Sequence, residues 1–257
     1  AYIINALLGS IGAKGGLPIT NKPGDFGRKG LKALADLYPK PEKERADGCG
    51  TKIPYIDAGP GLIHKNYEVM KSGDPYPIKA YIIHRHDPMM ALPDKPAMEE
   101  AWANLDLIVA NTFTWSDSAW FADVVLPISP YLERDSILAC KNGLKSFLFF
   151  RDRAIEPRYD TRSDWEILCG LAKRLGIEKL AFESLEDIHE YQLQDTGVSR
   201  DEFQQTGQVW LADSPKYREV SELSFKTPSG KLEMVNEKWD SAGCPSLKPY
   251  ESPERPP

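Results

Sequence analysis

The sequence has no excess of positive charge, no long apolar run and no recognisable targeting segment. Its 257 residues carry a net charge of −6 with a pI near 5.4, so no basic surface favours binding to nucleic acid. No apolar stretch approaches the roughly 20 residues that a membrane-spanning helix needs, which argues against direct membrane insertion. The amino terminus lacks the basic and apolar regions of a signal peptide.

Cysteines are few and scattered. The chain has four, Cys49, Cys140, Cys169 and Cys244, and no two of them form a Cys-x-x-Cys pair. Zinc sites and iron–sulphur clusters need more closely grouped ligands, so the sequence predicts neither. The spacing is compatible with free thiols or with one disulfide.

The composition is otherwise that of a globular protein, with 41% hydrophobic and 27% charged residues and no internal repeat. Residues 1–9 have the apolar spacing of a helix but no cap in front of them, so we expect the natural polypeptide to be longer. We predict one α/β domain over residues 1–236, loop-rich between 17 and 77, and an extended proline-rich tail over 237–257.

The segment from residue 105 to residue 135 gives the clearest signal of a fold. Two short apolar runs, 107–110 and 124–126, are separated by a polar segment long enough for one or two helical turns. Such runs joined by a helical crossover are typical of parallel strands covered on both faces. Ligands bind these sheets at the carboxyl ends of the strands, which here are Asn111-Thr112 and Pro127-Ile128.

A further strand is expected over residues 79–83, followed by a helix over 96–104, which together with the next run form a right-handed βαβ unit. The loop after this strand reads His84-Arg85-His86-Asp87-Pro88. Histidines two residues apart share a strand face and with Asp87 could hold a metal, but the chain offers no clear third or fourth ligand. A loop that contacts a polar ligand is therefore the favoured interpretation.

Two helices are predicted after this sheet. Ser163 is a suitable N-cap for a helix ending near Leu175, and Ser184 for a second helix over roughly 185–195. Residues 147–150 are predicted to be a short strand or a buried extended segment. The first helix has an apolar stripe composed of Ile167, Leu168, Leu171, Ala172 and Leu175.

Two glycine-containing segments each allow a structural and a functional interpretation. The sequence GSIGAKGG at 9–16 suits either a helix C-cap or a loop that contacts a phosphate, although it matches neither the Walker nor the dinucleotide-binding pattern. The sequence TPSGK at 227–231 is typical of a turn within a hairpin.

Five stretches, taken in order, resemble the molybdopterin oxidoreductases of the dimethyl-sulfoxide-reductase superfamily. They are NALLGSIGAKGG at 5–16, HDP at 86–88, ADVVLPISPYLERD at 122–135, AIEPRYDTRSDWEIL at 154–168 and TPSGK at 227–231. Each stretch alone is unspecific, and the match lies in their common order and spacing. The ERD, IEPRYDT and TPSGK sequences are most similar to the polysulfide and thiosulfate reductase branch.

The resemblance implies a Rossmann-like parallel sheet with flanking helices, forming the second half of a discontinuous domain that binds molybdopterin guanine dinucleotide. It implies no catalytic residue and no metal ligand in this chain, because molybdenum and the 4Fe–4S cluster are expected only in the full-length subunit. The enzyme would reduce polysulfide or thiosulfate, and the isolated chain would be inactive. Implied partners are the remainder of the catalytic subunit, an iron–sulphur electron-transfer subunit and a membrane-anchor subunit, on the periplasmic or extracytoplasmic face.

The resemblance also assigns contacts to the guanosine end of the cofactor. The residues concerned follow the strands or open the next helix, and they are His86, Asp87, Asn111, Thr112, Ile128 and Asp164. Asp87 and Asp164 are candidates for guanine and ribose contacts, since a carboxylate can accept hydrogen bonds from guanine and Asn or Thr can bond ribose hydroxyls. Alternatively, Asp164 only caps its helix, and Glu133-Arg134-Asp135 is a surface charge cluster.

Two other functions remain open. The enzyme could be an arsenate reductase or resemble formate dehydrogenase, and the residue that ligates molybdenum, outside this sequence, would separate these enzymes. The chain could instead be a free-standing nucleotide-binding or interaction module, which a cysteine cluster upstream in the full gene product would exclude.

Overall fold

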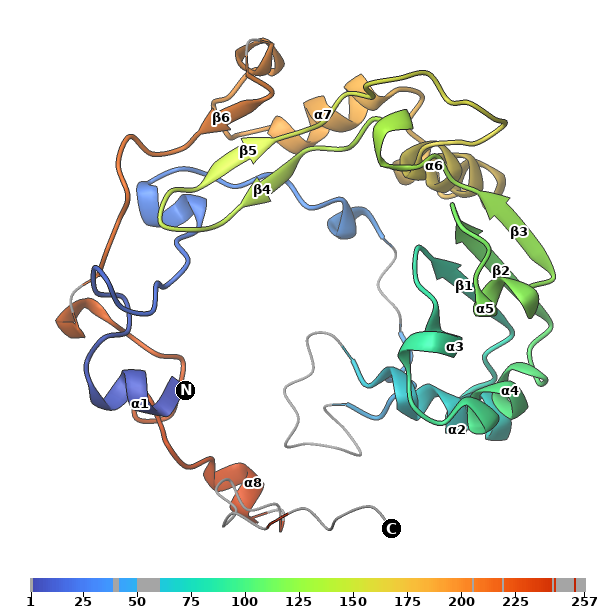
Figure 1. Ribbon diagram of the computed structural model, residues 1–257, viewed down its shortest axis with the longest axis horizontal. Helices are drawn as coiled ribbons and strands as arrows, with labels where there is room; N and C mark the ends of the chain where they lie inside the picture. The colour runs from blue at the N-terminus through green and yellow to red at the C-terminus, as the bar shows by residue number, and fades with distance from the viewer. Residues whose placement is uncertain are drawn as a thin grey trace.

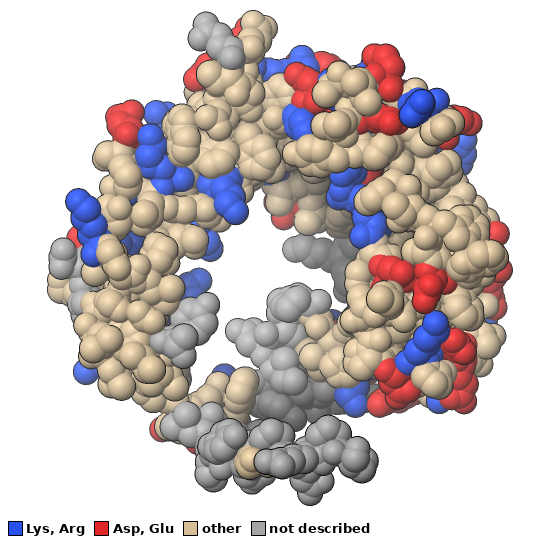
Figure 2. Space-filling view, viewed as in Figure 1, with Lys and Arg blue, Asp and Glu red and all other residues tan. Residues whose placement is uncertain are grey.

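We describe the fold from a computed structural model, and the residues described are 2–38, 42–49, 61–204, 206–218, 220–241, 243 and 252. Two three-stranded sheets lie in different parts of an open, ring-like arrangement (Figure 1). The space-filling view shows that the described segments surround an open centre (Figure 2).

The first sheet is parallel and has the order β1-β2-β3, with strands β1 (Ala80–His84), β2 (Leu107–Thr112) and β3 (Val124–Pro127). Helix α4 (Lys95–Trp102) connects the first two strands, and α5 (Asp117–Trp120) connects the last two. The predicted strand–helix–strand order is confirmed. Asn111, Thr112 and Pro127, which we expected beyond the strands, are their last residues.

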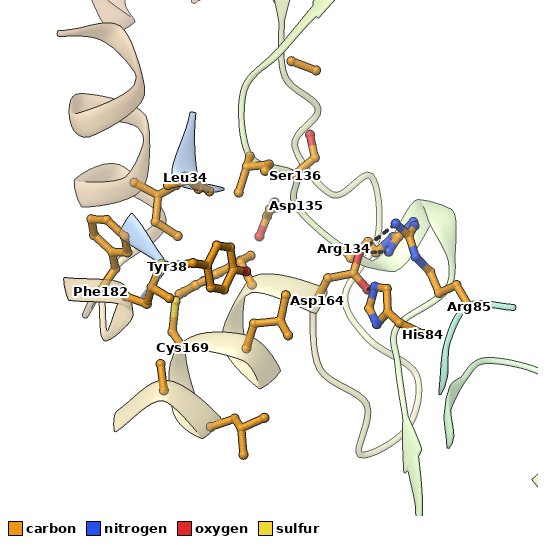
Figure 3. A pocket seen from close by; sticks show the side chains of 18 of the residues that line it. Leu34, Tyr38, His84, Arg85, Arg134, Asp135, Ser136, Asp164, Cys169 and Phe182 are labelled. Carbon is orange, nitrogen blue, oxygen red and sulfur yellow. Dashed lines mark hydrogen bonds and ion pairs between the residues drawn. The ribbon is translucent and has the colours of Figure 1, made fainter. Parts of the chain in front are cut away.

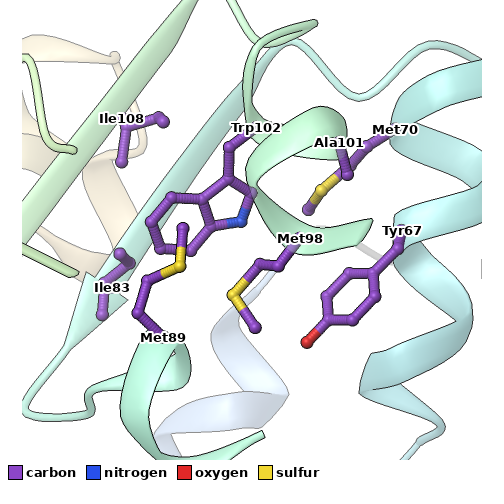
Figure 4. Close-up of a cluster of buried hydrophobic side chains, with 8 residues drawn as sticks. All are labelled: Tyr67, Met70, Ile83, Met89, Met98, Ala101, Trp102 and Ile108. Atoms are coloured by element: carbon purple, nitrogen blue, oxygen red, sulfur yellow. The ribbon is translucent and has the colours of Figure 1, made fainter. Parts of the chain in front are cut away.

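One face of the parallel sheet carries a hydrophobic core (Figure 4). Ile83 and Ile108 point toward α4 and toward α2 (Asn66–Ser72). Met98 and Trp102, both on α4, are buried in the same core. Asp94 holds the start of α4 by accepting a hydrogen bond from the Ala97 backbone N–H at 3.3 Å. Burial of each large apolar side chain contributes about 1.5–3 kcal/mol. The short helix α3 (Pro88–Ala91) completes this layer through Met89.

Helices lie on both faces of this sheet as expected, but within the described residues the opposite face is only partly covered. Ile82 and Val124 are 47% and 42% exposed, although both belong to strands. Among the described elements, helix α6 (Asp164–Arg174) lies over that face. It begins after Ser163 as predicted, and the chain turns at Gly176 with a φ of 71°.

The second sheet is antiparallel, and the sequence did not predict it as a sheet. Its order is β4-β5-β6, with strands β4 (Ala139–Lys141), β5 (Phe147–Phe149) and β6 (Gln208–Trp210). The predicted strand near residues 147–150 is its central member. Leu148 and Phe203 are enclosed beside helix α7 (Leu185–Leu193), which Ser184 and Asp187 cap as predicted.

The amino-terminal helix α1 (Tyr2–Leu7) ends at Gly9, whose φ is 64°. The N–H of Gly9 donates to Ala6 O, and that of Ser10 donates to Asn5 O. These bonds satisfy carbonyls at the end of the helix, so this glycine acts as a C-cap. Of the two interpretations of the loop, the structure supports the helix cap.

The remaining described segments are mostly loops with short 3-10 helices. Within TPSGK, the N–H of Gly230 donates to Thr227 O, which forms the predicted turn, but no strands flank it. The tail is not extended throughout, because α8 (Glu237–Ser241) is helical, and most of the chain after Ser241 lies outside the described residues. The 3-10 helices are η1 (Pro23–Phe26), η2 (Leu34–Leu37), η3 (Ile63–Lys65), η4 (Tyr131–Glu133), η5 (Glu178–Leu180), η6 (Arg200–Phe203) and η7 (Val220–Glu222).

Candidate functional site at the carboxyl ends of the parallel strands

Three elements bring polar side chains together at the carboxyl edge of the parallel sheet. His84 ends β1, Asn111 lies near the end of β2, and Asp164 is the first residue of α6. Ile128 and Arg162 form an isolated parallel bridge that extends the sheet beyond β3. This bridge delivers the amino terminus of α6 to the strand ends, so residues more than fifty positions apart meet there.

Asp164 is at the centre of a network of polar contacts, here called the Asp164 cluster, which it forms with His84, Arg85 and Arg134 (Figure 3). Arg134 donates from Nη1 to Asp164 Oδ2. Arg85 Nη2 lies 3.5 Å from the same oxygen, and His84 Nε2 lies 3.5 Å from Oδ1. Arg134 is only 7% exposed, so this part of the cluster is inside the protein.

Burial controls the protonation of the cluster. It lowers the pKa of His84 in the first place; Arg85 and Arg134 lower it further, and Asp164 opposes them. Because the ordinary histidine pKa is already about 6.5, His84 is neutral near pH 7. Burial also lowers the pKa of Arg134, opposed by the charge of Asp164. Arginine nevertheless stays protonated in proteins, so the Arg134–Asp164 pair is ionic.

The segment Glu133-Arg134-Asp135 is bound to the loop that follows β5. Glu133 Oε2 accepts a hydrogen bond from the Arg158 N–H at 3.0 Å, and Asp135 Oδ1 accepts one from the Arg153 N–H at 2.8 Å. These bonds fix the backbone on both sides of Arg134 and direct its side chain inward. Arg134 is therefore not part of a surface charge cluster.

The start of α6 is capped by residues other than Asp164. Ser163 and Glu166 form a capping box, in which the Ser163 N–H donates to Glu166 Oε2 at 2.7 Å. Asp164 is at the first helical position and uses its carboxylate for the cluster instead. Asp164 therefore does more than cap its helix, and the alternative interpretation of this residue as a helix cap only is wrong.

The other predicted site residues lie along the same edge but are engaged differently. Asp87 Oδ1 accepts hydrogen bonds from both the Ser118 N–H and the Ser118 hydroxyl, which tie the loop after β1 to α5. The Thr112 hydroxyl donates to Thr114 O at 2.7 Å. Ile128 is fully buried, and its N–H donates to Thr112 O. His86 is exposed.

Two buried oxygens at this edge have no hydrogen-bond partner among the described residues. They are Asn111 Oδ1 and Asp164 Oδ1, and His84 lies between the two side chains, with its Nδ1 3.5 Å from Asn111 Nδ2. Unpaired buried acceptors are rare in proteins and call for a physical explanation. Both atoms are enclosed, so a ligand reaches them only if neighbouring side chains move.

A cavity of about 600 Å³ lies beside the Asp164 cluster. Its polar end carries Arg85, Arg134 and Asp164, and Figure 3 shows Tyr38 and Phe182 at its apolar end. A volume of this order is typical of small-molecule sites. The edge therefore combines a cavity of ligand size with cationic donors and carboxylate and amide acceptors.

His84, Arg85 and Arg134 belong to the site but were not among the residues predicted for it from the sequence. His84 and Arg85 were visible only as an unusual loop after a strand. Arg85 has a φ of 49°, a conformation that is uncommon outside glycine and that no sequence pattern marked. Arg134 belongs to the charged triplet at 133–135, and the composition of this triplet does not predict that one of its side chains is buried.

The described residues contain no group of three or more His, Cys, Asp or Glu side chains that could hold a metal ion. Cys49, Cys140 and Cys169 are free thiols, and Cys244 lies outside the described residues. Among the described helices, none has both the length and the apolar character needed to cross a lipid bilayer.

Comparison with known proteins gives consistent matches. Residues 59–174 match the family model "Molybdopterin oxidoreductase". The thiosulfate reductase molybdopterin-containing subunit PhsA of Salmonella typhimurium is 30% identical over 91% of this chain and 35% of its own length. A trimethylamine-N-oxide reductase of Pasteurella multocida is 26% identical over 96% of this chain and 34% of its own length.

A solved structure supports the fold. Acetylene hydratase from Pelobacter acetylenicus superimposes with a TM-score of 0.59 and 24% identity, over 74% of this chain and 26% of that protein. The chain thus spans only about a third of the length of the curated relatives it matches. With its parallel sheet and the matching family model, this chain belongs to the molybdopterin oxidoreductases of the dimethyl-sulfoxide-reductase superfamily.

Proposed function

We propose that this chain is the part of a molybdenum oxidoreductase that binds the guanosine end of a molybdopterin guanine dinucleotide. The observation that carries the proposal is the convergence of Asp164, Asn111 and His84 at the carboxyl ends of parallel strands. This is where open α/β sheets bind nucleotides. Two of these side chains have unpaired buried oxygens, which suit a ligand rich in N–H and O–H donors.

The residues present fit such a group. Guanine presents N1–H and N2–H₂ as donors, which a carboxylate such as that of Asp164 can accept. Asn111 can accept from a ribose hydroxyl or from the base. Arg85, which is exposed at the rim, and Arg134 behind it supply positive charge for an anionic ligand. When bound, the molybdenum cofactor supplies the redox chemistry, and this chain grips and orients one end of it.

The two predicted carboxylates, Asp87 and Asp164, differ in the hydrogen bonds that they already accept from the protein. Asp87 is already committed to Ser118 through two hydrogen bonds, so a contact with guanosine would compete with these bonds. Asp164 keeps one oxygen without a hydrogen bond. We therefore assign the main guanosine contact to Asp164 and a supporting role in loop conformation to Asp87.

For the whole enzyme we propose reduction of a sulphur compound, thiosulfate or polysulfide. The support is the 30% identity to a thiosulfate reductase subunit over 91% of this chain. The remainder of the catalytic subunit, an iron–sulphur electron-transfer subunit and a membrane anchor remain its proposed partners. A full-length subunit that reduces trimethylamine N-oxide but neither thiosulfate nor polysulfide would overturn this substrate class.

The guanosine site can be tested by isothermal titration calorimetry of this chain with GDP. We expect binding to the wild type and a loss of about tenfold or more in affinity for Asp164→Asn, because charge-assisted hydrogen bonds contribute about 1.5–3 kcal/mol. Asp106→Asn is a matched control, because Asp106 precedes β2 at the opposite edge of the sheet and pairs with exposed Lys79.

The outcomes separate clearly. Unchanged GDP affinity in Asp164→Asn, or no binding to the wild type, would overturn the guanosine assignment. Equal affinity for ADP would also count against it, since adenine lacks the N1–H and N2–H₂ donors that the carboxylate is proposed to accept.

A further inference from the structure

His84 lies between the two side chains that carry unpaired buried oxygens at the carboxyl edge of the parallel sheet. It pairs with Asn111 in the register of β1 and β2, and its Nδ1 is 3.5 Å from Asn111 Nδ2. On its other side, its Nε2 is 3.5 Å from Asp164 Oδ1. Figure 3 shows the His84 ring beside the Asp164 carboxylate. Each ring nitrogen therefore faces a different member of the proposed guanosine site.

These two neighbours determine which ring nitrogen carries the proton. The NH₂ group of an amide is a donor only, so His84 Nδ1 accepts from Asn111 and carries no hydrogen. The charge of the Asp164 carboxylate favours a proton on the nitrogen that faces it, which is Nε2. Both contacts therefore assign neutral His84 to the Nε2–H tautomer.

The same contact fixes the direction of the Asn111 amide. Its nitrogen is turned to His84, so its oxygen, Oδ1, is the end that has no partner among the described residues. The terminal torsion of an asparagine side chain has two similar minima, and a half-turn exchanges the oxygen and the nitrogen. Neutral His84 therefore selects the orientation that offers a ligand an acceptor instead of a donor.

A protonated His84 would reverse this arrangement. Both ring nitrogens would then be donors, and Nδ1–H would repel the NH₂ group of Asn111. A half-turn of the amide would bring Oδ1 to Nδ1–H and leave Nδ2 without a partner. The site would then present a donor where guanosine, which is rich in N–H and O–H groups, needs an acceptor.

Charged groups from three elements act on His84. Asp164 faces it from α6, Arg85 follows it in the loop after β1, and Arg134 acts from the segment after β3. Burial lowers the pKa of His84, Asp164 opposes this effect, and the two arginines lower the pKa further. Because Arg134 donates to Asp164, part of the negative charge near the ring is already compensated. The ring therefore remains neutral near pH 7.

We infer that His84 is a positioning residue of the guanosine site, which in its neutral form accepts a hydrogen bond from the Asn111 amide and so presents Asn111 Oδ1 to an N–H or O–H of the ligand. The identity of the ligand rests on the proposed function, whereas the contact between His84 and Asn111 does not. Coupling between two bound groups is reciprocal, so guanosine binding and protonation of His84 oppose each other.

The first test needs no ligand. The full-length subunit is prepared without cofactor and with ¹⁵N-labelled histidine, and the His84 ring signals are identified by their loss in His84→Gln. At pH 7.5 we expect a proton on Nε2 and none on Nδ1. Asn111→Asp puts a carboxylate where the amide nitrogen donates, so it should raise the pKa of His84. A proton on Nδ1 at pH 7.5, or an unchanged titration of His84 in Asn111→Asp, would overturn the inference.

The second test is the affinity of the same subunit for guanosine as a function of pH, measured by calorimetry. Guanosine is the probe because, unlike GDP, it has no phosphate group that titrates near pH 6. We expect the affinity of the wild type to fall about tenfold or more as the ring signals show His84 becoming protonated. The fall should be absent in His84→Gln. His64→Gln, at an exposed position, is the matched control and should retain the wild-type profile.

Asn111→Ser separates an action through Asn111 from a direct effect of the charge on His84. A serine hydroxyl both donates and accepts, so the affinity of this variant should not follow the protonation of His84. A fall of about tenfold that persists in Asn111→Ser would show that His84 acts on the ligand directly and would overturn the inference. A wild-type affinity that stays constant while His84 becomes protonated would overturn it as well.

The two tests also separate the positioning role from the proposed function. An Nε2–H tautomer without any guanosine binding would refute the guanosine site alone. An Nδ1–H tautomer with guanosine binding would refute the positioning role of His84 alone.

Discussion

The guanidinium of Arg134 is buried and donates to the carboxylate of Asp164, thirty residues later in the chain. This pair connects the loop after β3 to the first residue of α6 and so holds the helix against the carboxyl edge of the parallel sheet. Arg85 shares the same carboxylate oxygen from the loop after β1. The proposed nucleotide site is therefore also a joint between three elements.

Replacing Arg134 should destabilise the protein. Arg134→Met leaves Asp164 with only its two longer contacts, and we expect a loss of about 2–3 kcal/mol, below the 3–5 kcal/mol of a fully buried pair because Asp164 is partly exposed. Urea denaturation measures this loss. Lys173→Met, which breaks the exposed pair with Glu183, should cost less than about 1 kcal/mol. Equal effects of the two substitutions would contradict the role of the buried pair.

The Asp87–Ser118 contact should be visible in a titration. Burial by itself would raise the pKa of Asp87, but hydrogen bonds from the Ser118 hydroxyl and backbone outweigh it and hold the pKa below the ordinary value. The stability from this group is therefore present above about pH 3.9 and is lost as pH falls through the lowered pKa.

Ser118→Ala should raise the pKa of Asp87 and cost about 1 kcal/mol, as measured by carboxyl NMR titration and by denaturation. Ser116→Ala is the control, because Ser116 caps α5 through the Ala119 N–H. If the Asp87 pKa moves equally in both variants, its cause is not the Ser118 hydroxyl.

His189 should make stability depend on pH. It is fully enclosed on α7, its Nε2 lies 3.1 Å from Ser136 O, and its Nδ1 has no partner among the described residues. Burial in the first place lowers the pKa of His189, so the unfolded chain binds this proton more readily. Stability should be complete above about pH 6.5 and fall as pH drops toward the lowered pKa, by at most about 1.4 kcal/mol per pH unit.

Denaturation between pH 7.5 and pH 5 measures this slope. His189→Gln, which retains a side-chain donor for Ser136 O, should flatten it. His64→Gln at an exposed position should leave it unchanged. A wild-type slope that persists in His189→Gln would show that other groups control stability in this range.

Asn21 joins three distant segments and should be sensitive to truncation. It is fully buried; its Nδ2 donates to Gly143 O and Lys216 O, and Arg218 donates to its Oδ1. Asn21→Ala should cost about 2–4 kcal/mol in a denaturation experiment, because it leaves buried groups unpaired. Asn104→Ala, which removes an exposed bond to Glu100 O, should cost less than about 1 kcal/mol. A small loss at Asn21 would mean that water replaces these bonds at no cost.

Local sequence determined the elements of the α/β region. The apolar runs at 107–110 and 124–126 became β2 and β3, and Ser163 and Ser184 begin α6 and α7 as predicted. These features depend on residues within a few positions of one another, so periodicity and capping chemistry are sufficient to find them. The order of five short motifs was similarly sufficient to identify the family.

Contacts between distant residues decided the remainder. The antiparallel sheet pairs residues 147–149 with 208–210, and no local pattern specifies such a partner. From the sequence, Asp87 and Asp164 were equal candidates for a contact with guanosine. In the fold, Asp87 accepts hydrogen bonds from Ser118. Asp164 is instead surrounded by His84, Arg85 and Arg134. Which groups a carboxylate contacts depends on which side chains from distant segments reach it, and only the tertiary structure fixes that.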